Sequence, residues 1–148
     1  MIEAGFEYDS SVFPVRHDVY GIRNFPKDPH LYTGSDSGSF VEFPISACDF
    51  FGYELPVAGG GYFRLYPYWF SWFCLNSVNQ AGRTFVFYLH PWEVDPTQPT
   101  VANINWKSKF RHYNNLDKCE SRFASLLKDF NFSSMENALV EKGFLQAL

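Results

Sequence analysis

One histidine of the sequence follows a predicted strand directly, at the position where α/β proteins place functional residues. His90 follows the apolar run from Phe85 to Leu89 and directly precedes Pro91. Ligands of α/β sheets and barrels bind at the carboxyl ends of strands, and histidine titrates near neutral pH. His90 is therefore a candidate general acid or base. The alternative is a histidine whose hydrogen bonds only close the end of a strand.

A run of three glycines, residues 59–61, leads into Tyr62, Phe63 and Arg64. Such a run can bind an anion at the start of a helix, but its spacing matches neither a P-loop nor a dinucleotide-binding loop. Close packing of the backbone is the simpler interpretation. Arg64 is the residue of this segment whose guanidinium could hold a substrate oxygen or a carboxylate.

Two further segments combine cationic side chains with rings. Residues 109–113 suit a polar ligand lined by aromatic side chains, and equally a solvated turn. The triplet Arg16, His17 and Asp18 leaves the same two interpretations open. A metal site needs ligands that share one face or loop, and the four histidines are isolated from one another. These residues alone therefore favour no metal site.

Three segments with helical periodicity could position these side chains. Residues 66–81 place apolar side chains on one helical face, with Pro67 in the first turn and Gly82 at the end. Residues 115–130 and residues 134–142 are expected to form two further helices. The apolar face predicted for the first helix consists of Tyr66, Trp69, Phe70, Phe73, Cys74 and Val78.

Strands are expected at two places. Residues 40–46 are expected to form a short strand, and because Pro44 cannot donate to a ladder it is an edge strand or a strand end. Residues 84–90 form an apolar strand that should be buried on both faces, as in a parallel sheet covered by helices. Pro and Gly punctuate residues 1–39, and residues 91–110 are rich in Pro, so both segments are expected to be irregular. A helix followed directly by a buried strand is typical of an α/β unit.

Composition excludes several classes of protein. Of the 148 residues, 46% are hydrophobic and 19% are charged, which favours one folded domain over a disordered chain. The net charge is −4 and no basic run occurs, which argues against nucleic acid as a partner. No apolar stretch approaches the length of about 20 residues that spans a membrane. Aromatic residues make up 20% of the chain and either fill a core or line a groove.

The amino-terminal residues and the cysteines both favour a location inside the cell. The first residues lack the basic start and apolar run of a signal peptide. Cys48, Cys74 and Cys119 are scattered and odd in number, which predicts buried thiols in a reducing compartment. We therefore expect a cytoplasmic location.

Several segments together resemble one family. In chain order they are residues 8–22 (Tyr-Asp-Ser-Ser-Val-Phe-Pro-Val-Arg-His-Asp-Val-Tyr-Gly-Ile), residues 43–46 (Phe-Pro-Ile-Ser), residues 56–64 (Pro-Val-Ala-Gly-Gly-Gly-Tyr-Phe-Arg), residues 87–99 and residues 110–116. This order resembles the carboxyl-terminal part of the polysaccharide deacetylases of bacterial exopolysaccharide loci. Those enzymes belong to carbohydrate esterase family 4.

The resemblance implies a distorted (β/α) barrel and metal-dependent removal of acetyl groups from N-acetylated sugars. In that family an Asp and two His hold a divalent metal, usually zinc, and a second Asp activates water. A late histidine protonates the leaving amine, and Leu89-His90-Pro91 matches its motif, so the resemblance implies that His90 is the general acid. Asp9 matches a motif that supports the catalytic groups.

The residues expected to bind substrate all lie within the segments that carry the resemblance. They are Tyr62, Arg64, Trp92, Arg111 and His112. The expected partner is an N-acetylated polysaccharide or oligosaccharide.

The motifs that hold the metal and the catalytic base in that family are absent from this chain. The resemblance therefore implies that residues 1–148 are a single unit, the carboxyl-terminal portion of a deacetylase domain with its carboxyl-terminal extension. We expect a partial (β/α) barrel with few strands and about three helices. We expect no cofactor in this chain, zinc in the complete enzyme, and little activity without the missing half.

Two alternatives of another class remain open. The aromatic residues could serve a carbohydrate-binding module without catalysis, or a protein-interaction module with an exposed aromatic face. In the deacetylase hypothesis, the chain should associate with the missing amino-terminal half or with itself.

Overall fold

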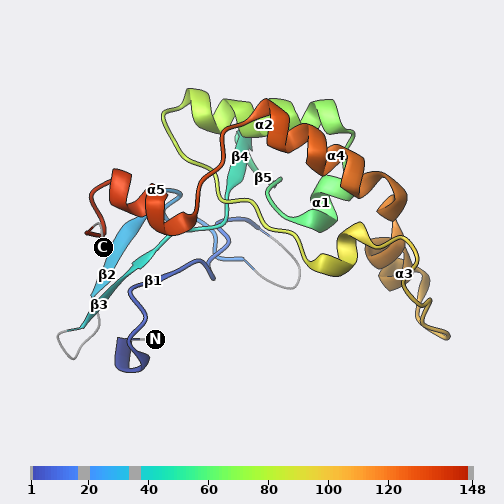
Figure 1. Ribbon diagram of the computed structural model, residues 1–148, viewed down its shortest axis with the longest axis horizontal. Coiled ribbons are helices and arrows are strands. Elements are labelled where there is room, and N and C mark those ends of the chain that lie inside the picture. The colour runs from blue at the N-terminus through green and yellow to red at the C-terminus, as the bar shows by residue number, and fades with distance from the viewer. Residues whose placement is uncertain (1, 17–20, 34–37, 147–148) are drawn as a thin grey trace.

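The computed structural model describes residues 2–16, 21–33 and 38–146. Within them the chain forms five short strands in two small sheets, five α-helices and no closed barrel (Figure 1). The partial α/β fold predicted from the sequence is confirmed, although the helices are more numerous than the three expected. His17 and Asp18 lie outside the described residues.

The larger sheet has three strands in the order β1-β3-β2. β1 (Tyr8–Asp9) pairs in parallel with β3 (Ser39–Glu42), and β2 (His30–Thr33) pairs with β3 in antiparallel fashion. The strand predicted over 40–46 therefore exists but ends before Pro44, whose missing N–H cannot continue the ladder. The helix α5 (Met135–Glu141) lies beside this sheet, as Figure 1 shows. Their contact is a small core that contains Val41, Phe43, Ala138 and Leu139.

The second sheet is a hairpin of β4 (Ala47–Phe50) and β5 (Tyr53–Pro56). Its two-residue turn consists of Phe51 and Gly52, which have φ angles of 48° and 80°. Turns of this length need left-handed backbone at both positions. The sequence did not predict the hairpin, because Phe is rare at such an angle and conceals the turn signal.

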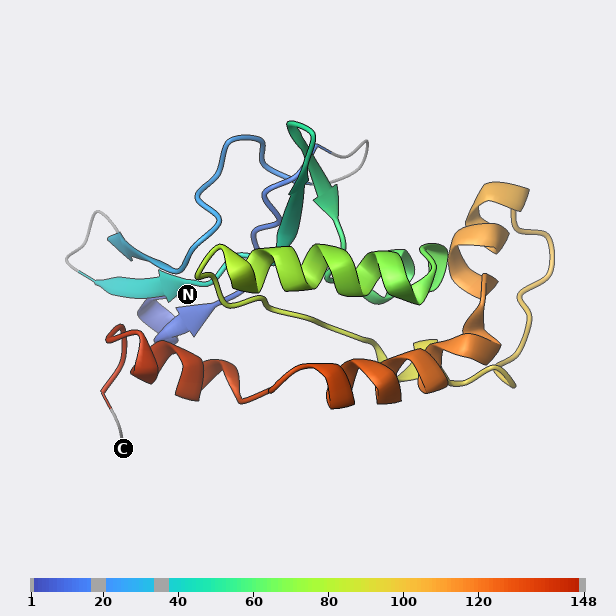
Figure 2. The same ribbon diagram turned by 90° about the horizontal axis from the view of Figure 1, so that it is seen from above.

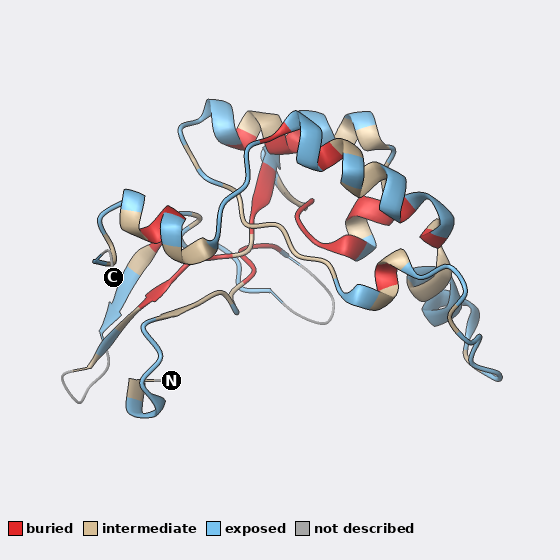
Figure 3. Cartoon of the chain, in the orientation of Figure 1, coloured by how far each residue is buried: buried red, intermediate tan, exposed pale blue. Residues whose placement is uncertain are grey.

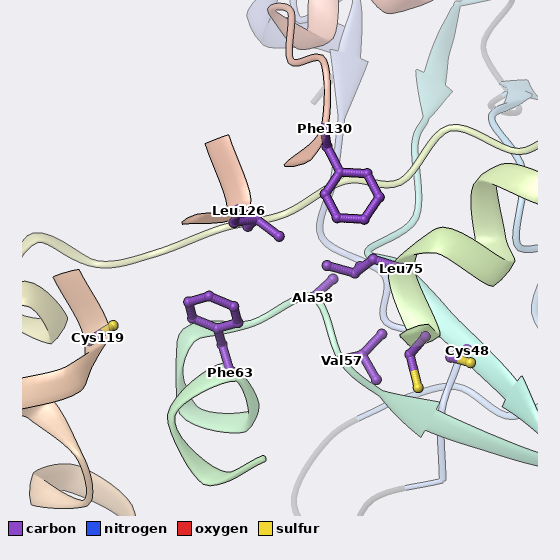
Figure 4. Packing of buried hydrophobic residues seen from close by; sticks show 9 residues of the cluster. Cys48, Val57, Ala58, Phe63, Leu75, Cys119, Leu126 and Phe130 are labelled. Carbon is purple, nitrogen blue, oxygen red and sulfur yellow. The ribbon is translucent and has the colours of Figure 1, made fainter. Parts of the chain in front are cut away.

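Helices α1 (Gly60–Leu65), α2 (Tyr68–Gln80) and α4 (Leu116–Asp129) surround the main core. In Figure 4, Phe63 of α1, Leu75 of α2 and Leu126 of α4 face the same interior. Cys48, Cys74 and Cys119 are free and buried, which confirms the prediction of buried thiols. Burial is the main cause that raises the pKa of Cys74 to about 12.

The apolar face predicted for the helix at 66–81 is correct for Cys74 and Val78, which are buried, and wrong for Trp69 and Phe73. Trp69 and Phe73 are 68% and 48% exposed, whereas Leu75, which lay off that face, is fully buried. The buried residues of α2 are Ser71, Cys74, Leu75 and Val78. The helix is rich in aromatic residues on several sides, so periodicity alone did not identify the side that faces the core.

The strand predicted over 84–90 is not formed. Within the described residues, the only β-bridge of this extended segment is an isolated parallel one between Gly59 and Tyr88. Phe85, Phe87 and Leu89 pack on the main core, and none of the segment is fully buried. Figure 2 shows the segment running between α2 and α4, so helices rather than neighbouring strands cover it.

The single turn η2 (Pro91–Val94) and the helix α3 (Trp106–Tyr113) follow the extended segment and lie towards one end of the molecule in Figure 1. A short turn η1 (Ile2–Ala4) opens the chain, away from α3. Figure 3 shows α3 mostly exposed, whereas α1 and the start of α4 are buried where they meet. Within the described residues, the helices are too short or too polar to cross a membrane.

Gly60 and Gly61 provide a matched test of the packing at the start of α1. A Cβ at Gly60 would collide with the carboxylate of Glu93, whereas a Cβ at Gly61 meets nothing within 4 Å. We expect Gly60→Ala to lower the free energy of unfolding by about 1–3 kcal/mol through overpacking. Gly61→Ala should raise it by up to about 1 kcal/mol, because alanine favours the helix. Urea unfolding of both variants measures the difference, and equal effects would contradict the close approach.

Candidate functional site

The interior beside α1 contains a buried ion pair. Arg64 on α1 and Glu93 on η2 are 1% and 2% exposed, and Arg64 Nη2 lies 3.1 Å from Glu93 Oε1. Arg64 Nε donates to the same oxygen at 3.2 Å. Removing two charges from water costs several kcal/mol per ion, so such a pair persists only where further hydrogen bonds complete it.

Those further bonds come from backbone carbonyls at the end of α3. Arg64 Nη1 donates to the carbonyls of His112 at 2.9 Å and Asn114 at 2.8 Å, and Nη2 donates to that of Arg111 at 3.2 Å. With the two bonds to Glu93, all five N–H donors of the guanidinium are used. Arg64 therefore acts as framework, and the expectation that it binds substrate would require one of these bonds to break.

The backbone of Arg64 is held from the opposite direction. Asn115 Nδ2 donates to the Arg64 carbonyl at 2.8 Å, and Arg122 Nη1 donates to it at 3.0 Å. Arg122 also donates to the carbonyls of Phe63 and Tyr66 at the end of α1. Asn115, with a left-handed φ of 50°, starts α4 while its side chain serves α1. The short helix α1 is thus fixed by residues about 50 positions later in the chain.

The second oxygen of Glu93 holds the backbone at His90. The N–H of His90 donates to Glu93 Oε2 at 3.0 Å, and His90 directly precedes the turn η2. The side chain of His90 is exposed. One buried carboxylate therefore fixes both the arginine of α1 and the peptide that carries the candidate general acid.

Three rings stack above this ion pair. The Trp92 and His112 rings lie 4.2 Å apart at 12° to each other, and the His90 and Trp92 rings lie 6.0 Å apart at 10°. The guanidinium carbon of Arg64 is 5.2 Å from the Trp92 ring centre, a cation–π contact. His112 Nε2 is 2.8 Å from Oε1 of Gln98, whose amide in turn donates to the Trp92 carbonyl. Gln98 therefore joins the His112 ring, at one end of the stack, to the backbone of Trp92.

An open cavity of about 380 Å³ lies against this stack. Its lining contains Gly61, Tyr62, Arg64, Tyr88, His90, Trp92, Glu93, Ser108, Arg111 and His112. Every residue expected to bind substrate lines this cavity, and so does His90. The residues come from α1, the extended segment, η2 and α3, so the fold gathers four separate stretches of sequence.

Asp9 does not line the cavity. It lies on β1 opposite Glu42 of β3, in the other half of the structure. Glu42 is buried and accepts a hydrogen bond from the N–H of Val12 at 2.9 Å. Burial raises the pKa of Glu42, and the nearby Asp9 carboxylate adds to the shift. The segment that follows Asp9 reaches the cavity indirectly, because Tyr62 packs against the small core of Phe13, Val15 and Ala47.

Burial and the nearby ion pair both affect the pKa of a cysteine close to the cavity. Cys119 on α4 is fully buried, and burial is the main cause that raises the pKa of its thiol. The charge of Glu93 adds to this shift, while Arg64 and Arg122 oppose it. Across residues 2–16, 21–33 and 38–146, no group of three His, Cys, Asp or Glu side chains could hold a metal ion.

Sequence reasoning missed the residues that organise the site. Gln98 and Arg122 had no predicted role, and the contacts that Glu93 and Asn115 make with Arg64 were not predicted, because these partners are many positions apart in the chain. The signal for Glu93 was its place three residues after His90, which suits a carboxylate that caps a helical turn. Two of the three glycines at 59–61 serve close packing, since Gly59 faces the Tyr88 ring and Gly60 faces the carboxylate of Glu93, whereas Gly61 faces open space.

Comparison with known proteins gives one family. A family model described as a domain of unknown function, DUF3473, matches residues 10–140. The matched range includes every residue of the cavity lining. No curated protein and no solved structure matches the chain.

Breaking the buried ion pair tests whether it organises the structure. Glu93→Gln leaves the charge of Arg64 buried without a counter-charge, and we expect the free energy of unfolding to fall by about 3–5 kcal/mol. The matched control is Asp28→Asn, which breaks the Arg83–Asp28 pair at an aspartate 65% exposed. That change should cost less than about 1 kcal/mol. Urea unfolding of both variants makes the comparison, and a similar small loss for each would contradict the framework role.

Proposed function

We propose that this chain, which belongs to the DUF3473 family, forms one side of the active site of a deacetylase that removes N-acetyl groups from an amino-sugar polysaccharide. The family is a domain found at the carboxyl terminus of polysaccharide deacetylase proteins of the exopolysaccharide type. The observation that carries the proposal is the cavity in which His90, Trp92 and His112 meet Tyr62 and Arg111.

In this proposal His90 is the general acid. The nitrogen of the sugar must gain a proton as its bond to the acetyl carbon breaks, and an imidazolium suits this transfer near neutral pH. The proton moves from the His90 ring to the departing amine, which leaves a neutral imidazole and a free amino sugar. Glu93 holds the His90 backbone at 3.0 Å, and the exposed ring borders the cavity where the amine would lie.

The rings of the cavity supply a surface for the sugar. Trp92 offers a flat apolar ring, and sugar rings pack their C–H faces on such surfaces. Tyr62 and Arg111 provide polar groups at the cavity wall that suit sugar hydroxyls. The Arg64–Glu93 pair takes no part in binding and keeps the wall rigid.

Water activation belongs to groups outside this chain. The resemblance implies a divalent metal, usually zinc, with its own ligands and a base. The described residues present no ligand cluster that fits such a metal, and no step of the proposal passes through one. The chain contributes the acid and one wall, so we propose that it has little activity by itself.

Replacement of His90 in the complete deacetylase tests the assignment. We expect His90→Gln to lower kcat by about 10²–10⁴-fold, because it removes the proton donor. KM and metal content should change little, because the interaction acts in the transition state and His90 is not a ligand. The matched control is His30→Gln, since His30 lies on β2 and does not line the cavity. Near-normal kcat, or loss of the metal, would overturn the role of general acid.

The stacked rings also favour a second function, carbohydrate binding without catalysis. If this is the activity, the 148-residue chain alone binds N-acetylated oligosaccharides. Trp92→Ala then weakens that binding at least tenfold, since stacking on a ring contributes about 0.5–1.5 kcal/mol beyond buried area. Trp69→Ala on α2 is the control, because Trp69 is exposed away from the cavity lining. Titration calorimetry measures both variants, and no binding by the unmodified 148-residue chain, or an equal loss in the two variants, would contradict this function.

A further inference from the structure

The extended segment 84–90 has one edge that is bonded and one that is not. The N–H of Val86 donates to Ser46 Oγ at 2.8 Å, and the N–H of Tyr88 donates to the Ala58 carbonyl at 3.0 Å. The alternate N–H groups, of Phe85, Phe87 and Leu89, donate to no acceptor in the part of the chain that the structure describes. Alternation of this kind is that of a strand at the edge of a sheet.

Ring contacts hold this extended segment in place. Phe85 packs at 5.1 Å from the Phe130 ring, and Phe87 packs at 5.0 Å from the Phe63 ring. These contacts fix the segment between α2 and α4, as Figure 2 shows. Unused donors on a preordered backbone are a template for another strand.

A groove of about 490 Å³ borders the same residues. Its lining is mostly apolar and comprises Phe87, Leu89, His90, Pro91, Val94, Glu120 and Phe123. An added strand would set its carbonyls against the alternate N–H groups, which recur about every 6.6 Å along a strand. Its apolar side chains would fill the groove. No side chain or small ligand presents acceptors at that repeat, so the occupant is polypeptide.

We infer that the open edge of residues 84–90 receives a β-strand from the metal-binding portion of the deacetylase. This inference rests on the proposed function. The family is found at the carboxyl terminus of deacetylase proteins, so polypeptide precedes it there and supplies a strand without a separate partner. Docking by strand addition satisfies backbone groups and buries alternate side chains together. It also sets His90, at the end of the segment, beside the portion that activates water.

Residue-resolved hydrogen exchange tests the edge. In the 148-residue chain, the amides of Phe85, Phe87 and Leu89 should exchange fast, whereas those of Val86 and Tyr88 should be protected. In the complete deacetylase the first three should slow by at least about tenfold, the change expected for one hydrogen bond. Unchanged exchange there would overturn the inference. Protection in the 148-residue chain that rises with its concentration would assign the edge to a second copy, which overturns it as well.

A matched pair at Leu89 gives a second measurement. Leu89→Pro and Leu89→Ala both truncate the side chain, but only Pro removes the N–H. Because this N–H has no partner among the described residues, both variants should unfold at similar urea concentrations. Leu89→Pro should bind the separately produced metal-binding portion about tenfold more weakly than Leu89→Ala. Equal affinities, or a selective loss of stability in Leu89→Pro, would overturn the inference.

The two proposals fail in different ways. If the three amides become protected while His90→Gln keeps full activity, the strand docks and the role of general acid is wrong. If activity depends on His90 while the amides stay exposed, the role of general acid stands and the strand is wrong.

Discussion

The Arg64–Glu93 ion pair is the constraint on which the site depends. It joins α1 to η2, and through the carbonyls of Arg111, His112 and Asn114 it joins both to the end of α3. Each of these segments contributes residues to the cavity wall. The cavity therefore has one buried centre, and its wall residues take their positions from it.

The value of this ion pair lies in placement more than in stability. Burying two charges costs several kcal/mol per ion before their attraction and hydrogen bonds offset the loss. A well-packed apolar contact would hold α1 as firmly, but it would not specify direction. Five donors in one plane, all of them bonded, restrict the arrangement of the three segments. The site gains a fixed geometry in this way.

Periodicity located the long helices because their apolar residues recur over three or more turns. The helices at α2, α4 and α5 were predicted within a few residues of their observed ends. Helix α1 was not predicted, since it begins with two glycines that disfavour helix and is stabilised by distant partners such as Arg122. The extended segment 84–90 resembled a buried strand because an apolar run carries no sign of which neighbours cover it.

Most of the predicted site residues share one cavity, but the contacts that hold them there were not predicted. The resemblance to a family gathered His90, Trp92 and His112 on one list, and the structure sets their rings in one stack. It also suggested Arg64 as a ligand, whereas every donor of that side chain is used internally. Local sequence could not reveal this, because Glu93 lies 29 positions from Arg64 and the carbonyls nearly 50. Contacts of that separation depend on the fold.

The guanidinium of Arg64 bonds the end of α3 through main-chain oxygens, which every amino acid carries. The side chains at 111 and 112 can therefore change in evolution while the guanidinium keeps its acceptors. Selection on the buried contacts of Arg64 can therefore act independently of selection on the side chains that line the cavity. Homologues that act on different polymers could diversify at these positions without first repairing their interior.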